Sequence, residues 1–201
     1  PVGQDFTAGL AAASLKGLRI GVLRKQAGSH AGITALFDRA LADMRAAGAE
    51  LVEVPWDMPE AMGRDEFTVL LYELRADLGT YLRDLPGNPP IRSLADAIAF
   101  NKANAATELR WFGQDIFELA ERTTDAAQYR KARANSLRLA GKEGIDRLLA
   151  LHKVALLVAP TTGPAWPIDL VTGDHFLSDV GAGSPAAIAG YPHLTVPMGA
   201  V

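Results

Sequence analysis

The chain has 201 residues, a length that fits one large domain or two small ones. Hydrophobic residues make up 49% and charged residues 21%, which excludes wholesale disorder, and the net charge of −3 excludes a strongly basic surface for nucleic acid or anionic membranes. The sequence contains no cysteine, which excludes disulfides, cysteine-ligated metals and a cysteine nucleophile.

The first third of the sequence predicts a β-α-β unit over residues 15–60. Residues 16–23 read as a turn followed by a short buried strand. Apolar residues then recur at spacings of three and four from Ile33 to Met44, which predicts an amphipathic helix that ends at Gly48. Residues 50–54 alternate like a strand, so we expect parallel strands joined by a right-handed crossover.

The middle of the chain, residues 64–152, is predicted to be helical. An apolar stripe runs along residues 67–85 and ends at Pro86. Ser93 is a candidate N-cap for a helix over 94–122 that is interrupted at Gly113, and another helix is expected over 125–139 with helical register continuing to residue 152.

The last segment, residues 153–201, is predicted to complete the sheet. Residues 154–159 and 194–196 read as strands buried on both faces. They are separated by a proline-braced loop over 160–167 and a short helix over 184–189 with Pro185 at its first helical position. The order of elements predicts an α/β layer fold.

The ends of the chain lead to expectations about its context. It begins with Pro1 and ends directly after an expected strand, which favours a fragment of a longer protein. Asp5 interrupts the apolar start and no basic residue precedes Lys16, so no secretory signal is predicted. Residues 180–201 lack charged side chains, but their prolines and glycines break any membrane-spanning helix. We therefore expect a cytoplasmic protein without a membrane partner.

Nucleophile, metal and nucleotide motifs are incomplete. Ser184 does not lie in a G-x-S-x-G turn, and its residue pattern favours a helix cap. The four histidines show no metal-ligand spacing, so no metal site is predicted. Residues 181–186 match G-x-G-x-x-A, but the strand before them is weak and no acidic residue follows at the required distance. The residues alone therefore give an α/β protein without a complete catalytic set.

Several segments nevertheless carry a family likeness in their order and spacing. They are LKGLRIGV at 15–22, AAGAELVEV at 46–54, YELRADL with YL at 72–82, FN at 100–101, FGQD at 112–115, LLVAPT at 156–161 and AGYPHLTVPMG at 189–199. Together they resemble the C-terminal half of the amidase signature family, in the branch that includes bacterial peptide amidases.

This resemblance implies a single large α/β fold with a mixed central sheet flanked by helices. It also implies hydrolysis of a carbon–nitrogen amide bond in a small-molecule or peptide amide by a Ser–cis-Ser–Lys triad, without metal or organic cofactor. In that chemistry a serine attacks the carbonyl, a second serine relays protons, a lysine acts as the base and backbone N–H groups stabilise the oxyanion.

The chain departs from the family because the serine-rich signature and the catalytic lysine belong to the N-terminal half. No Ser-Ser dipeptide occurs here, and none of the six lysines lies in a segment that matches the family's catalytic-lysine motif. We therefore expect residues 1–201 to be a C-terminal fragment of one amidase-type domain, without catalytic residues and inactive alone. Its expected partners are the missing N-terminal half and an amide substrate, with self-association as a further possibility.

Five residues are candidates for substrate contact. Thr161 and Thr162 follow a predicted strand end, where ligands commonly bind, and Trp166 could line an apolar pocket. Asn101 and Gln114 are amides that match the branch pattern. Helix capping by the threonines, core packing of the tryptophan and backbone bonding of the amides are the alternatives. For the whole chain, the alternative is a non-catalytic domain that binds a small molecule or serves a structural or regulatory role.

Overall fold

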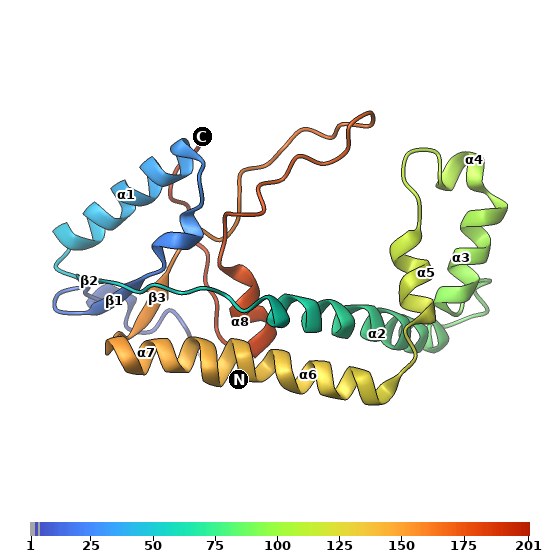
Figure 1. The fold of residues 1–201 in the computed structure, drawn as a ribbon, viewed down its shortest axis with the longest axis horizontal. Coiled ribbons are helices and arrows are strands. Elements are labelled where there is room, and N and C mark those ends of the chain that lie inside the picture. Colours follow the sequence, from blue (N-terminus) through green and yellow to red (C-terminus); the bar gives the residue numbers. More distant parts are fainter. Residues whose placement is uncertain (1–2, 4) are drawn as a thin grey trace. The chain divides into compact units, whose positions relative to one another are not determined.

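The computed structural model describes residue 3 and residues 5–201, which divide into two compact units. We call the first the sheet unit; it comprises Pro1–Asp57, Gly141–Ile168 and Asp174–Val201. The second, the helical unit, comprises Met58–Ala140 and Asp169–Gly173. Figure 1 labels the elements, and each unit has an apolar cluster of its own.

Three parallel strands form the centre of the sheet unit. They are β1 (Arg19–Val22), β2 (Glu50–Glu53) and β3 (Leu156–Val158), in the order β2-β1-β3 (Figure 1). The chain leaves β1 through a short 3₁₀ turn, η2 (Arg24–Ala27), and returns to β2 along helix α1 (Ala31–Ala46). An earlier 3₁₀ turn, η1, covers Leu10–Ala12. This small parallel sheet with flanking helices confirms the predicted α/β fold class.

The core of the sheet unit joins α1 to the strands. Phe37 and Leu41 of α1 are buried together with Val22 of β1, and Met198 from the end of the chain packs against them. Gly21 explains how closely the strands and their neighbours approach, because a Cβ atom there would lie 2.7 Å from the Leu157 side chain. A larger residue at this position would push apart the packing on which the sheet depends.

The ends of α1 follow from two residues. The His30 imidazole caps the helix, since its Nδ1 accepts a hydrogen bond from the Ile33 N–H at 3.2 Å. Gly48 follows the helix with a φ of 94°, and a Cβ atom there would lie 3.0 Å from the Lys16 backbone. Only glycine adopts this left-handed turn without strain, which is why the predicted stop at Gly48 is correct.

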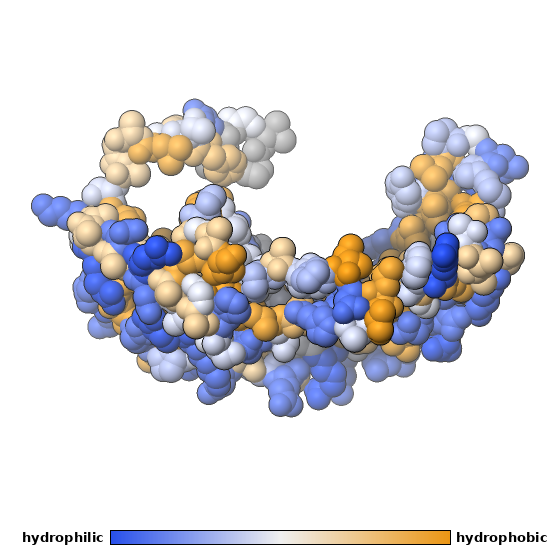
Figure 2. Space-filling model, turned by 90° about the horizontal axis from the view of Figure 1, so that it is seen from above, coloured by the Kyte–Doolittle hydropathy of each residue, from blue (hydrophilic) through white to orange (hydrophobic). Residues whose placement is uncertain are grey.

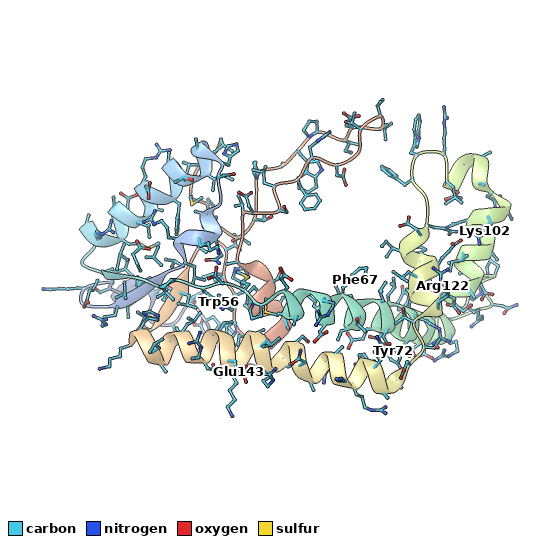
Figure 3. The ribbon with its side chains drawn as sticks, viewed as in Figure 1. Trp56, Phe67, Tyr72, Lys102, Arg122 and Glu143 are labelled. Carbon is cyan, nitrogen blue, oxygen red and sulfur yellow. The ribbon has the colours of Figure 1, made fainter. Side chains whose placement is uncertain are left out.

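The helical unit contains α2 (Glu60–Asp84), α3 (Leu94–Ala103), α4 (Ala105–Glu108), α5 (Asp115–Arg122) and α6 (Ala126–Ala140). Its core is formed by Leu71, Leu94, Ile98 and Ala120. The long helices α2 and α6 pack on each other, and the rings of Tyr72 and Tyr129 are stacked at 4.2 Å between centroids. Tyr72 is labelled in Figure 3. The Tyr129 hydroxyl also donates to Glu73 at 2.7 Å, which adds a polar tie to this packing.

Two helix starts in this unit were readable from the sequence. The Ser93 hydroxyl accepts a hydrogen bond from the Asp96 N–H at 3.1 Å, which confirms Ser93 as the N-cap of α3. The Asp125 carboxylate accepts from the N–H groups of Ala127 and Gln128, at 2.8 and 3.0 Å, and so begins α6. In both cases a side-chain oxygen accepts a hydrogen bond from N–H groups in the first turn of the helix, which have no partner within the helix.

Two predictions for the helical segment need correction. The expected helix over 94–122 is interrupted around Gly113 as predicted, between α4 and α5, but it also breaks between α3 and α4, where Asn104 donates its side-chain amide to the Phe100 carbonyl at 2.9 Å. The stripe on α2 is also only partly buried. Leu71 lies in the core and Leu74 and Leu78 pack against it, whereas Phe67, Leu70 and Tyr81 of the same stripe are exposed.

After α6 the chain changes its helical geometry within the sheet unit. Residues Gly141–Asp146 form a π-helical segment, η3, and Arg147–His152 form α7. Gly141 and Gly144 are both buried in η3. The predicted helical register up to residue 152 is therefore kept through a wider turn, a type of segment that is rare in proteins and often lies near functional sites.

The C-terminal strands differ from the prediction. β3 covers only Leu156–Val158 at an edge of the sheet, and Leu156 is 39% exposed, so the strand is not buried on both faces. Residues 194–196 form no strand with any described residue, and Leu194 is 85% exposed. The hydrophobicity of these residues indicated burial within a sheet. Among the described residues, however, β3 has a neighbouring strand on one side only. Helix α8 (Gly183–Ala189) confirms the predicted short helix, but it begins earlier than expected, so its N-cap is Ala182 rather than Ser184 and Pro185 is its third residue.

Apolar side chains consequently lie on the surface of both units, as the orange residues in Figure 2 show. Among the residues that the structure describes, no helix has both the length and the apolar character needed to cross a membrane.

Candidate functional site

A large groove opens in the sheet unit beside β3. Its volume is about 1170 Å³, and its walls come from one face of α1, from β3 and the loop after it, and from the extended end of the chain. Residues of these walls include Leu36, Phe37, Met44, Leu156, Val158, Thr161, Thr162, Pro185, Tyr191, His193, Thr195 and Met198. The groove is therefore mainly apolar, with a few hydroxyl and imidazole groups at one place, which is the usual composition of a ligand site.

The polar part of the groove lies where β3 ends. The Thr161 and Thr195 hydroxyl oxygens are 3.1 Å apart and share a hydrogen bond. This contact joins the loop after β3 to the extended segment after α8. Of the five candidate residues, Thr161 and Thr162 are the ones that line the groove.

A glycine brings the start of α8 against Thr161. Gly181 has a φ of 126°, and a Cβ atom there would lie 2.7 Å from the Thr161 carbonyl oxygen. The neighbouring Ala182 N–H donates to the Pro160 carbonyl at 3.2 Å. The G-x-G pattern at 181–183 therefore serves close backbone packing at the end of β3, a structural use of glycine that needs no nucleotide.

The same corner is closed from the other side by an aspartate. The Asp179 carboxylate accepts hydrogen bonds from the Ser29 hydroxyl at 2.7 Å and from the Ser29 N–H at 2.8 Å. These bonds, the hydroxyl first, hold the pKa of Asp179 below its usual value because they stabilise the charged form. The Gly181 N–H donates to the carbonyl of Gln26. The Gln26 side chain is buried, and its amide donates to the carbonyl of Trp56, which is labelled in Figure 3.

The other three candidates lie elsewhere. Asn101 donates its amide to the Gln114 side chain at 3.0 Å, and Gln114 donates to the Ile98 carbonyl at 3.2 Å, so this pair braces α3 against the start of α5 in the helical unit. Trp166 lies beside Phe176, with 5.8 Å between ring centroids, and is 41% exposed. It is not among the described residues that line the groove.

Sequence reasoning did not select His193 and Thr195 for this site. Both line the groove from the extended segment at 191–200. Their spacing of two residues was a usable signal, because alternate residues of an extended chain point to the same side. The predicted strand at 194–196 instead suggested burial in a sheet.

No metal site emerges from the side chains that the structure places. Within residue 3 and residues 5–201, no group of three or more histidine, aspartate or glutamate residues could hold a metal ion. The polar groups that line the groove include the hydroxyls, the His193 imidazole and the charged side chains of Arg39 and Asp43.

Comparison with known proteins identifies the family. The model of the family described as Amidase matches residues 2–201. The chain belongs to the amidase family. This confirms the resemblance seen in the sequence, including the likeness to peptide amidases.

Individual amidases give the extent of the match. A probable amidase of Arabidopsis thaliana is 30% identical over 196 residues, which cover 94% of this chain and 33% of that protein. The crystal structure of the native peptide amidase from Stenotrophomonas maltophilia matches with a TM-score of 0.83 and 40% identity, over 100% of this chain and 41% of that one. A peptide amidase in complex with the competitive inhibitor chymostatin gives 0.87 and 42%, again over 100% and 41%. The chain thus spans between 33% and 41% of these amidases.

The Asp179–Ser29 contact predicts a pH-dependent stability for this amidase chain. Because the folded-state pKa of Asp179 is lowered, its contribution is present above the unfolded-state value of about 3.9 and is lost as the pH falls through the folded-state value. Asp179→Asn should therefore lower the unfolding midpoint near pH 7, and the difference from wild type should shrink below about pH 4. Asp174→Asn, an exposed aspartate of the same loop, is the matched control. A difference that stays constant with pH would contradict the assignment.

Proposed function

We propose that the protein containing this chain hydrolyses the amide bond of peptide amides. The observation that carries the proposal is the match of the whole chain, at 40–42% identity, to peptide amidases of known structure. Such identity over a complete segment supports a shared reaction more strongly than a shared fold alone would.

In this proposal the sheet unit supplies one wall of the substrate site. The groove beside β3 combines apolar surface with the Thr161 and Thr195 hydroxyls, which suits the side chain and the backbone of a peptide respectively. Thr162 shares the groove, while Trp166, Asn101 and Gln114 remain candidates for contacts outside it. The hydroxyls would orient the amide, because a held geometry removes part of the entropic barrier to reaction.

The reacting groups are proposed to lie outside residues 1–201. A Ser–cis-Ser–Lys triad needs two serines and a lysine close together, and this sequence has no Ser-Ser dipeptide. More than half of the length of each relative also lies outside the part that this chain matches. A further segment of the same protein, corresponding to the N-terminal half of the family, would supply the nucleophile, the proton relay and the base.

A cytoplasmic location of the protein stays a prediction.

The central experiment is an ammonia-release assay on the intact protein with a C-terminally amidated peptide. We expect hydrolysis that chymostatin inhibits competitively, by analogy with the peptide amidase that binds it. An intact protein that binds peptide amides without turning them over would instead support the alternative, a non-catalytic binding domain.

Thr161 and Thr162 should affect substrate affinity more than stability. Thr161→Val and Thr162→Val each remove one hydroxyl with little change of shape, so we expect KM to rise about threefold to tenfold, the equivalent of one hydrogen bond. Thr68→Val on α2 is the control, since that hydroxyl only meets the Arg64 carbonyl of its own helix. Steady-state kinetics and thermal melts check this, and unchanged KM in both variants would remove the threonines from the site.

Residues 1–201 alone should be inactive. Without the proposed triad, the groove can bind an amide but cannot attack it, so the purified 201-residue chain should release no ammonia above the uncatalysed rate. The intact protein serves as the positive control. Turnover that persists through successive purification steps would show that the reacting groups lie within this chain.

The isolated chain should also associate with itself or with the missing half. Both edges of the three-stranded sheet lack a described neighbour, and Leu194 and Val196 are 85% and 65% exposed. Unpaired edges beside apolar surface favour association. Sedimentation should show species above 21.3 kDa, and Leu194→Lys with Val196→Lys should reduce them. A monomer that unfolds cooperatively would contradict this.

A further inference from the structure

The extended segment 192–201 forms a long wall of the groove, yet little of its own backbone is bonded. Among the described residues, its backbone makes no hydrogen bond to other backbone groups. Its position must therefore be set by side chains and by the residues at its two ends. We call this segment the wall segment.

The far end of the wall segment is anchored in the core. Met198 packs against the cluster around Phe37, and Gly199 comes so close to α1 that a Cβ atom there would lie 2.4 Å from the Leu36 side chain. Between the ends, the hydroxyl contact of Thr195 with Thr161 is the polar attachment.

The near end meets the π-helical segment η3. Tyr191 follows α8 directly, and its N–H donates to the Ala186 carbonyl at 2.9 Å. Its hydroxyl donates to the Asp146 carboxylate at 2.8 Å. A Cβ atom on Gly141 would lie 3.3 Å from the same hydroxyl oxygen, so the glycine leaves just enough room for the phenol. The Tyr191 hydroxyl therefore lies against both ends of η3, bonded to Asp146 at one end and close to Gly141 at the other.

We propose that Tyr191 and Asp146 form a positioning clamp that sets the wall segment, and with it His193 and Thr195, along the groove. The clamp joins the residue before the segment to the last residue of η3, and Tyr191 itself lines the groove. The bond to the carboxylate also raises the pKa of the Tyr191 phenol, which keeps the hydroxyl protonated as the donor. The consequence for substrate affinity rests on the proposed amidase function, whereas the placement of the segment does not.

Hydrogen exchange of the intact protein tests the placement without any substrate. Tyr191→Phe and Asp146→Ala each break the clamp, so the hydrogen-bonded amides of Gly190 and Tyr191 at the near end of the wall segment should exchange about threefold to tenfold faster, the equivalent of one hydrogen bond. Asp146→Asn keeps an acceptor oxygen and should stay near wild type. Tyr81→Phe is the matched control, because Tyr81 is an exposed tyrosine in the helical unit.

A double-mutant cycle decides whether the two residues act as a pair. Tyr191→Phe combined with Asp146→Ala should exchange no faster than either single variant, since both remove the same bond. Additive effects, or wild-type protection in both single variants, would overturn the clamp.

Kinetics provide the arm that rests on the proposed function. With a peptide amide, KM should rise about threefold to tenfold in Tyr191→Phe while kcat stays within about twofold, and Asp146→Asn should restore KM. Faster exchange together with an inactive wild type would retain the clamp and reject the function. An active wild type with unchanged exchange and KM in the variants would retain the function and reject the clamp.

Discussion

The sheet unit depends on β1 carrying two parallel neighbours at once. The Val54 N–H donates to the Val22 carbonyl on one side, and the Leu23 N–H donates to the Val158 carbonyl on the other, at 2.9 and 3.0 Å. Parallel neighbours cannot be joined by a tight turn, so the chain reaches β2 by way of α1 and reaches β3 only after helices α2 to α7. The central strand therefore holds together parts of the chain that are far apart in sequence.

This pairing also decides where the candidate site lies. The carboxyl ends of parallel strands share one edge of the sheet, and the segments that follow β1 and β3 meet there. The Gly181 N–H reaches the Gln26 carbonyl after β1, and the Ala182 N–H reaches the Pro160 carbonyl after β3. Asp179 adds its two bonds to Ser29 at the same edge. The loop that carries Thr161 is therefore fixed from several directions rather than left as a free surface loop.

How well a feature could be predicted from the sequence depends on how far apart in the sequence its interacting residues lie. The stop at Gly48 and the cap at Ser93 depend on neighbours within a few residues, and their patterns were readable. The strand at 19–22 was readable from its own apolar run, although its two partners were not. The break at Asn104 depends on one side chain turning back, which competes with helix formation at close energy. The contacts of Thr161 with Thr195 and of Tyr191 with Asp146 cross long stretches of chain, so no local pattern announces them. The error at 194–196 has the same origin, because a strand needs a partner that hydrophobicity cannot name.

In the proposed function, the groove holds the substrate and another segment of the protein attacks it. The described walls of the groove offer hydroxyls, an imidazole, the charged side chains of Arg39 and Asp43 and apolar surface, which would bind and orient a peptide amide. A wall that orients a substrate must itself be fixed, because a displacement of about 1 Å can cost about two orders of magnitude in rate. In the wall segment, that stiffness cannot come from a backbone ladder within the described chain. Side-chain anchors at its two ends and the threonine pair between them can supply it, which gives the proposed clamp a physical reason beyond the stability of the fold.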